Sequence, residues 1–247
     1  FKEIAKNAVV ENITFEGAID AENITPENEI NIGLIAGINN GTLENVFIIL
    51  GQSKVSSSGS YKINIGGVVG QNNGTITASG TLVRFTSALT FTDIGSHNSE
   101  HILLIGGVTG KNTGTISRDA SNAATEINNA STTADVNIIV LSKITTKNND
   151  GTESITTDVS LVTGENEGIG AIAGYSNGAL TGLKAIGEIC AGNFSDGKFG
   201  GHFNNVGGLV GYNSANITDS ISQVFVRGKT NVGGLVGIQK GGKLSLN

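Results

Sequence analysis

The sequence predicts an all-β chain folded as a parallel β-solenoid, or β-helix, of about six to eight glycine-rich coils. Three observations predict this class. A short glycine pattern recurs six times along the 247 residues. The segments between the copies are short, rich in β-branched residues and punctuated by Gly and Asn, which is typical of strands and turns. No amphipathic helical periodicity is sustained over about a dozen residues.

The repeat has Ile or Val at position one, Gly at positions two and six, and Ile, Val or Leu at position four. Its six copies are residues 32–37, 65–70, 105–110, 169–174, 206–211 and 232–237. The position-six glycines are 33, 40, 64, 37 and 26 residues apart. This uneven spacing suits a coil that accepts insertions at its corners and argues against identical propeller blades. The interval of 64 residues predicts either a degenerate copy or a long insert.

A polar turn follows each copy, and an aliphatic residue then returns. The turns begin at Asn39, Asn72, Asn112, Ser176, Asn213 and Gln239, and the aliphatic residues are Leu43, Ile76, Ile116, Leu180, Ile217 and, one position later, Leu244. Residues 43–48 align with 217–222, and residues 10–15 fit the same half, so residue 1 is expected to lie within an earlier copy. Asn-Gly in these turns predicts corners of positive φ, because Gly and Asn tolerate that region.

Stacked coils are expected to bury position four of each copy on position four of the next, at about 4.8 Å per strand. Positions one and four differ in parity. Either both faces of the strand are therefore covered, or a glycine bends it. Ordinary β-hairpins in a sandwich or barrel remain an alternative, because Asn-Gly is also a hairpin signal. The predicted aliphatic column consists of Ile35, Val68, Val108, Ile172, Leu209 and Leu235.

One domain is expected over residues 1–247, with a polar insert at 118–160 between the third and fourth copies. The insert is expected to protrude as a hairpin with its tip near Asn149, Asp150 and Gly151. Residues 85–100 form a smaller interruption. Insertions on one face of a solenoid often bind ligands, and a solvated spacer is the simpler interpretation.

Charge and composition limit the partners. The net charge is −6 and the pI about 5.1, which argues against a nucleic-acid partner. No apolar run reaches the roughly 18 residues of a membrane span. The chain has no Met, so it is expected to be processed from, or an excerpt of, a longer chain. Its one cysteine, Cys190, cannot form an internal disulfide and is expected to be a small core residue.

No catalytic, cofactor-binding or metal-ligating residue is predicted, and the chain is not expected to be an enzyme. Residues 97–101 match His-x-x-Glu-His, but that zinc motif needs a helix, whereas these residues lead into a predicted strand. Residues 237–243 resemble a phosphate loop but lack its final hydroxyl. Threonine pairs at 75/77, 90/92 and 113/115 are too irregular for an ice-binding array. The scattered carboxylates leave open one acidic cluster between adjacent coils: Asp93, Asp119, Asp135, Asp150, Glu153, Asp158, Glu165 and Glu167.

The sequence Gly-Gly-Leu-Val-Gly, at residues 207–211 and 233–237, resembles the GLUG motif of large bacterial surface proteins. That family includes adhesins and the non-catalytic repeat regions of immunoglobulin-A-cleaving metallopeptidases. The resemblance implies a secreted or cell-surface, β-helical structural region that acts as a stalk, spacer or filament-forming unit. Flanking repeats or neighbouring subunits would be its end-to-end partners, and a host, matrix or glycan ligand would bind its lateral face or inserts. The alternatives are a β-helical polysaccharide-active enzyme and the spacer region of a surface peptidase.

Overall fold

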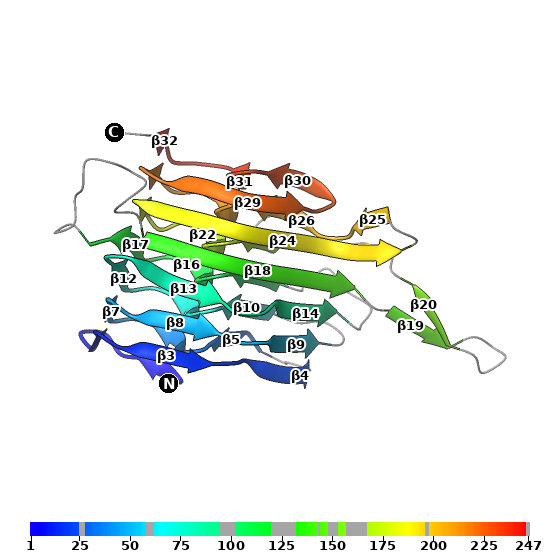
Figure 1. Cartoon of the computed structure of the whole chain (residues 1–247), viewed down its shortest axis with the longest axis horizontal. Coiled ribbons are helices and arrows are strands. Elements are labelled where there is room, and N and C mark those ends of the chain that lie inside the picture. The colour runs from blue at the N-terminus through cyan, green and yellow to red at the C-terminus, as the bar shows by residue number, and fades with distance from the viewer. Residues whose placement is uncertain are drawn as a thin grey trace.

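The computed structural model describes residues 1–24, 28–57, 62–93, 102–119, 132–142, 144–147, 153–156, 167–195 and 198–245. These residues form strands β1 to β32, and within them there is no helix. Most strands pair in parallel within four stacked sheets, here named A to D (Figure 1). The all-β prediction is confirmed, and the parallel pairing is consistent with a β-solenoid.

Sheets A and B each contain seven strands. Sheet A consists of β1 (Glu3–Ile4), β6 (Ala36–Asn39), β11 (Val69–Asn72), β16 (Thr109–Asn112), β22 (Ala173–Ser176), β27 (Val210–Asn213) and β31 (Val236–Gln239). Sheet B consists of β2 (Val9–Glu11), β7 (Thr42–Glu44), β12 (Thr75–Ala78), β17 (Thr115–Arg118), β23 (Leu180–Thr181), β28 (Ile217–Thr218) and β32 (Leu244–Ser245).

Of the four sheets, sheet C has ten strands, the most, and sheet D has six, the fewest. Sheet C contains β3 (Thr14–Gly17), β4 (Asp20–Ile24), β8 (Phe47–Leu50), β9 (Ser53–Ser57), β13 (Thr81–Phe85), β14 (Leu89–Asp93), β18 (Thr132–Ser142), β24 (Leu183–Ser195) and β29 (Ile221–Arg227), with β25 (Lys198–Gly201) antiparallel to β24. Sheet D contains β5 (Ile30–Gly33), β10 (Lys62–Gly66), β15 (Ile102–Gly106), β21 (Glu167–Gly170), β26 (Asn204–Gly207) and β30 (Thr230–Gly233).

The chain passes through sheets D, A, B and C in turn and then returns to D one strand further along. Each passage is called a coil below. Sheets A and B have a strand in all seven coils, whereas sheet D has none in the first coil and sheet C none in the last. In Figure 1 the coils rise from β3 and β4 at the bottom to β32 at the top.

The strand register reproduces the sequence repeat. Each aliphatic residue that follows a turn is paired with its equivalent in the next coil, in the order Val10, Leu43, Ile76, Ile116, Leu180, Ile217 and Leu244. The one-residue slip expected at Leu244 is therefore confirmed. All but the two end members of this column are nearly or fully buried.

The repeat glycines form the corner between sheets D and A. Position two ends a strand of sheet D, and position five begins a strand of sheet A, so the chain bends between them. A Cβ on Gly66 would clash with the carbonyl oxygen of Val69 in the same copy. The bend lets positions one and four both face the interior, which resolves their opposite parity. The expected column is buried: Ile35, Val68, Val108, Ile172 and Leu209 are at most 4 % exposed, and Leu235 packs half-buried in the last coil.

The prediction of positive φ at the Asn-Gly turns is wrong. Their glycines are required by close stacking, because a Cβ on Gly74 or Gly114 would meet the carbonyl oxygen of the glycine one coil earlier. In the turns between sheets A and B, positive φ occurs only at Asn7 of the first coil and Gly242 of the last among the described residues, with values of 70° and 74°. It recurs at the corner between sheets B and C, where the values are 54°, 49° and 50° at Asn12, Asn45 and Asp219.

A ladder of buried side-chain amides runs along the turn between sheets A and B. The Nδ2 of Asn39 donates to Oδ1 of Asn72 at 2.8 Å, and Nδ2 of Asn72 donates to Oδ1 of Asn112 at 2.8 Å. Asn112 then donates to Oγ of Ser176 at 3.0 Å. Since an unsatisfied buried amide is costly, the ladder favours the register in which each rung meets the next.

The insert between copies three and four is shorter than expected, because part of it belongs to sheet C. Residues 132–142 fall within the predicted insert at 118–160, but they form β18 in the centre of sheet C and pair with β13, β14 and β24. Outside the four sheets lies an antiparallel hairpin of β19 (Ile144–Lys147) and β20 (Glu153–Thr156), which extends beyond sheet C in Figure 1. The expected tip at residues 149–151 is outside the described residues.

Candidate interaction surfaces

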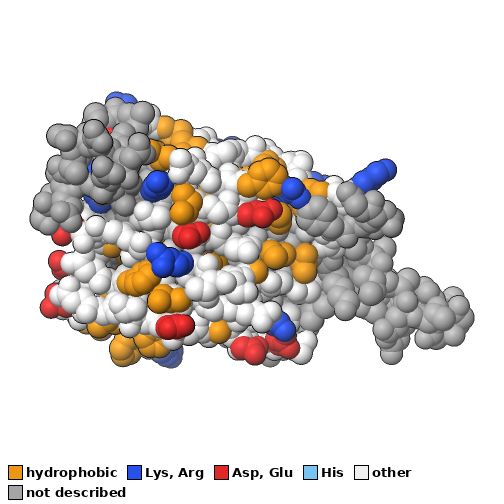
Figure 2. Space-filling view, viewed as in Figure 1, with side chains coloured by type: hydrophobic (Ala, Val, Ile, Leu, Met, Phe, Trp, Pro, Cys, Tyr) orange, Lys and Arg blue, Asp and Glu red, His pale blue; other side chains and the backbone are white. Residues whose placement is uncertain are grey.

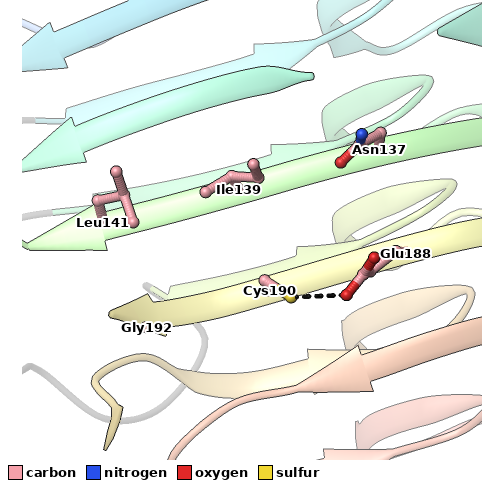
Figure 3. A pocket seen from close by; sticks show the side chains of 6 residues that line it. All are labelled: Asn137, Ile139, Leu141, Glu188, Cys190 and Gly192. Carbon is pink, nitrogen blue, oxygen red and sulfur yellow. Dashed lines mark hydrogen bonds between the residues drawn. The ribbon is translucent and has the colours of Figure 1, made fainter. Parts of the chain in front are cut away.

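The outer face of sheet C carries an open groove of about 260 Å³ between β18 and β24 (Figure 3). Alternate side chains of β18, such as Ile138 and Val140, are fully buried in the core, and those between them face outward. In β24, Ile189 and Ala191 are likewise buried in the core. The groove is lined by the outward-facing positions Asn137, Ile139, Leu141, Glu188, Cys190 and Gly192.

The thiol in this groove is held in its protonated form. Cys190 Sγ donates a hydrogen bond to Oε1 of Glu188 at 3.0 Å. Burial raises the pKa of the Cys190 thiol to about 12, and the hydrogen bond and charge of Glu188 add to the rise. A thiol is a poor nucleophile. Cys190 is buried, as expected, but it lies on the outer side of the sheet and not within the core cluster.

Two buried carboxylates approach each other between sheets C and D. Glu167 begins β21 and Asp93 ends β14, and both are completely buried. Burial raises the pKa of Glu167 to about 8, and the charge of Asp93 contributes to the rise. Hydrogen bonds from Asn204 and the charge of Lys229 oppose it; the backbone N of Asn204 donates to Oε1 of Glu167 at 2.5 Å. The structure thus brings together two of the eight scattered carboxylates, but in the interior and not on an accessible face.

The other candidate site residues from the sequence either belong to the repeat or lie outside the described residues. The motif at residues 97–101, including His97, Glu100 and His101, lies outside the described residues, as do Asp150, Asp158 and Glu165. The loop-like segment 237–243 is the end of β31 and the following turn. Among the residues that the structure describes, no group of three or more His, Cys, Asp or Glu is arranged to hold a metal ion.

Hydroxyl side chains form two columns on the outer face of sheet B. The threonine pair 75/77 lies beside Thr115 and Ser117 of the next coil, in register. Thr113 is instead in a turn, where its Oγ1 donates to Oδ1 of Asn73 at 2.7 Å. The columns, each half-buried, are Thr42, Thr75 and Thr115, and Thr77, Ser117, Thr181 and Thr218. The register therefore aligns hydroxyls whose spacing in the sequence is irregular.

The two ends of the stack expose side chains that are buried elsewhere. Among the described residues, every strongly exposed large apolar side chain lies in the first coil or on the last strand of a sheet. Phe15 is 44 % exposed, whereas its neighbour in register, Ile48, is fully buried. Leu244 is 44 % exposed, whereas its neighbour Ile217 is 3 % exposed. Phe1, Ile13 and Phe15 are exposed at one end and Val232 and Leu244 at the other. Val9 and Phe225 are instead exposed on the outer faces of sheets B and C, in register with Thr42 and Glu188.

No described helix is long and apolar enough to cross a membrane. No family model, no curated protein and no solved structure matches this chain.

Proposed function

We propose that the chain is a parallel β-solenoid that serves as a non-catalytic structural and adhesive repeat region of an extracellular protein, similar to the GLUG repeat regions of bacterial surface proteins. The observation that carries this proposal is the continuous interior, whose apolar columns run through the coils and are exposed only at the two ends. Such an interior suits a stalk or spacer, because each coil needs its neighbours to bury its apolar side chains.

Stiffness along the stack supports the spacer role. Strands of successive coils are joined by backbone hydrogen bonds in all four sheets, and also at the corners, as where the N of Ile35 donates to the carbonyl oxygen of Val68 at 2.9 Å. The amide ladder adds side-chain bonds in the same direction. Seven coils at the usual strand spacing span roughly 30 Å, so one chain would separate what flanks it by about that distance.

The lateral surfaces supply the adhesive part of the proposal. The groove of sheet C combines apolar side chains, Ile139 and Leu141, with the polar Asn137 and Glu188. Sheet B presents hydroxyl groups in register. Apolar contact with a few fixed polar groups is typical of ligand sites. A matrix or glycan ligand would contact these faces without covering the ends.

A polysaccharide-active enzyme is the alternative to an adhesive region, and glycoside hydrolysis normally uses two carboxylates across the bond. Among the described residues, Glu188 is the one carboxylate that lines the groove. No feature of the described residues specifically favours this alternative, and a direct assay separates the two.

The test is a panel of immobilised matrix proteins and neutral and acidic glycans, on which both binding and product release are measured. Binding without product release is expected. Ile139→Lys with Leu141→Lys should weaken binding by about tenfold or more if the groove is the contact, since a buried unpaired charge is costly. Gln71→Lys on sheet A, which belongs to neither of these two faces, is the control for added charge. Turnover of any glycan would contradict a non-catalytic role.

A further inference from the structure

A column of side chains on the outer face of sheet A contains two adjacent tyrosines. The column is formed by the residue that directly follows position six of each copy of the repeat. The register of sheet A aligns these residues from coil to coil, and none of them belongs to the core cluster. In order along the stack they are Ile38, Gln71, Lys111, Tyr175, Tyr212 and Ile238.

The two tyrosine rings are stacked on each other. Tyr175 lies in β22 of the fifth coil and Tyr212 in β27 of the sixth, and their ring centroids are 5.8 Å apart with the planes inclined by 19°. Stacking at this separation is favourable for aromatic pairs. Because neighbouring strands of a sheet lie about 4.8 Å apart, the backbone holds the rings within reach of each other. The pairing depends on the register, since the two residues are far apart in the sequence.

The composition of the chain directs oxidation to tyrosine. The chain contains no Met and no Trp, and it has one thiol. That thiol, of Cys190, donates to Glu188 and has a pKa raised to about 12, whereas cysteine oxidation proceeds through the thiolate. Cys190 also lies on another face, the outer face of sheet C, where Figure 2 shows apolar side chains among basic and acidic ones. The three tyrosines are therefore the most readily oxidised side chains of the chain.

The two stacked rings differ in their access to an oxidant. Tyr175 is half-buried, whereas Tyr212 is 9 % exposed. A one-electron oxidant therefore reaches Tyr175 first, and the ring of Tyr212 is stacked on the radical that forms. Transfer of an electron and a proton from Tyr212 restores Tyr175, and a second oxidation of Tyr175 then leaves two radicals side by side.

We propose that Tyr175 and Tyr212 form a modification site at which hydrogen peroxide, acting through a haem peroxidase, joins the two rings as dityrosine. Each phenol loses one electron and its O–H proton, and the two radicals combine through a new C–C bond between ring carbons next to the oxygens. The hydrogens on those carbons then move to the oxygens as protons through water, which restores both aromatic rings and both hydroxyls. The two electrons and two protons removed at the start reduce one hydrogen peroxide to two water molecules.

The cross-link would tie the fifth coil covalently to the sixth. At this junction sheets B and D each pair through only two residues of each strand, so the backbone pairing there is short in two of the four sheets. A covalent link also closes a loop that the unfolded chain must keep, which makes unfolding less favourable. The proposal does not depend on ligand binding by the lateral faces and therefore goes beyond the proposed function.

The test treats the whole chain with hydrogen peroxide and a haem peroxidase at low protein concentration, where coupling between molecules is rare. The monomer is then isolated, its dityrosine fluorescence is recorded, and its digest is analysed by mass spectrometry. The expected product is a monomer lighter by two hydrogens, whose cross-linked peptides contain Tyr175 and Tyr212. Tyr175→Phe and Tyr212→Phe keep an aromatic ring but remove a phenol, so each should lose this product. Tyr61→Phe, which removes the third tyrosine, is the matched control and should keep it.

Oxidation of the unfolded chain shows whether the fold selects the pair. In urea the preference for the link between Tyr175 and Tyr212 should be lost, and links that involve Tyr61 should appear. The cross-linked wild-type monomer should also unfold at a higher urea concentration than the untreated chain. A folded wild-type monomer that gains no cross-link, or gains it between other tyrosines, would overturn the proposal. Dityrosine retained in the monomer of Tyr175→Phe or Tyr212→Phe would do the same, and each of these outcomes leaves the proposed function to its own binding assay.

Discussion

Replacing Leu209 by asparagine places an amide in the aliphatic column at position four of the repeat. Leu209 is fully buried, and its carbonyl oxygen accepts hydrogen bonds from the backbone N of Ile172 and of Ala173. Loss of a buried leucine costs about 2–5 kcal/mol, and an unpaired buried amide adds about 1–3 kcal/mol. The free energy of unfolding should therefore fall by about 3–8 kcal/mol, a large part of the 5–15 kcal/mol typical of a domain.

Equilibrium unfolding in urea, followed by circular dichroism, measures this change. Leu209→Ala is the milder companion, with an expected loss of about 2–5 kcal/mol, and remains measurable if the asparagine variant does not fold. Leu235→Asn is the matched control, because Leu235 occupies the same position half-buried in the last coil and should cost clearly less. A change within about 0.5 kcal/mol for Leu209→Asn would refute the assignment of position four to the core.

Three further changes test other features. Asn72→Ala removes one rung of the amide ladder and should cost about 2–4 kcal/mol in urea unfolding, because both neighbours lose a partner, whereas the exposed Asn73→Ala should stay within about 1 kcal/mol; equal effects would contradict the ladder. Gly66→Ala should cost about 3 kcal/mol or more in thermal unfolding, while Gly80→Ala, which has open space around it, should change little; the reverse order would contradict the corner geometry. Glu167 holds its proton more tightly when folded, with its pKa raised from 4.5 to about 8, so its contribution to stability is complete below pH 4.5 and is lost as pH rises toward 8. Glu167→Gln should flatten that part of the measured stability profile, and an unchanged slope would contradict the burial of this carboxyl.

The sequence repeat was sufficient to predict strands, turns and the interior columns. Position four and the aliphatic residue after each turn recur with the same chemistry, and a stack of coils must align them. The expected slip at Leu244 was confirmed for the same reason. These features depend on periodicity alone, which is visible in a single sequence.

Features set by contacts between coils were not predictable. The turn asparagines, such as Asn72, look like solvated turn residues in sequence, and their burial follows from the stacking of one turn on another. The Asn-Gly turns predict a glycine with positive φ. Glycine is required there for another reason, because the carbonyl oxygen of the preceding coil leaves no room for a Cβ. The absence of the glycine pattern predicts an insert where β18 lies, although the alternating apolar residues of β18 pack into the core beneath sheet C. Glu167 carries no sequence signal that it is buried.

The candidate surfaces on the lateral faces also depend on contacts between coils. The groove of sheet C depends on the register of β18 and β24. Side chains fifty residues apart meet there, and nothing in their local sequence indicates it.

Residue-resolved hydrogen exchange at low protein concentration tests the central claim, a continuous stack of parallel strands, most directly. At low concentration the amides of β10, β11, β15 and β16 should exchange slowest and those of β1, β2, β31 and β32 fastest, because only the latter have one unpaired edge in sheets A and B. End strands that are as protected as the central ones at low concentration, or central strands that exchange freely, would contradict the account.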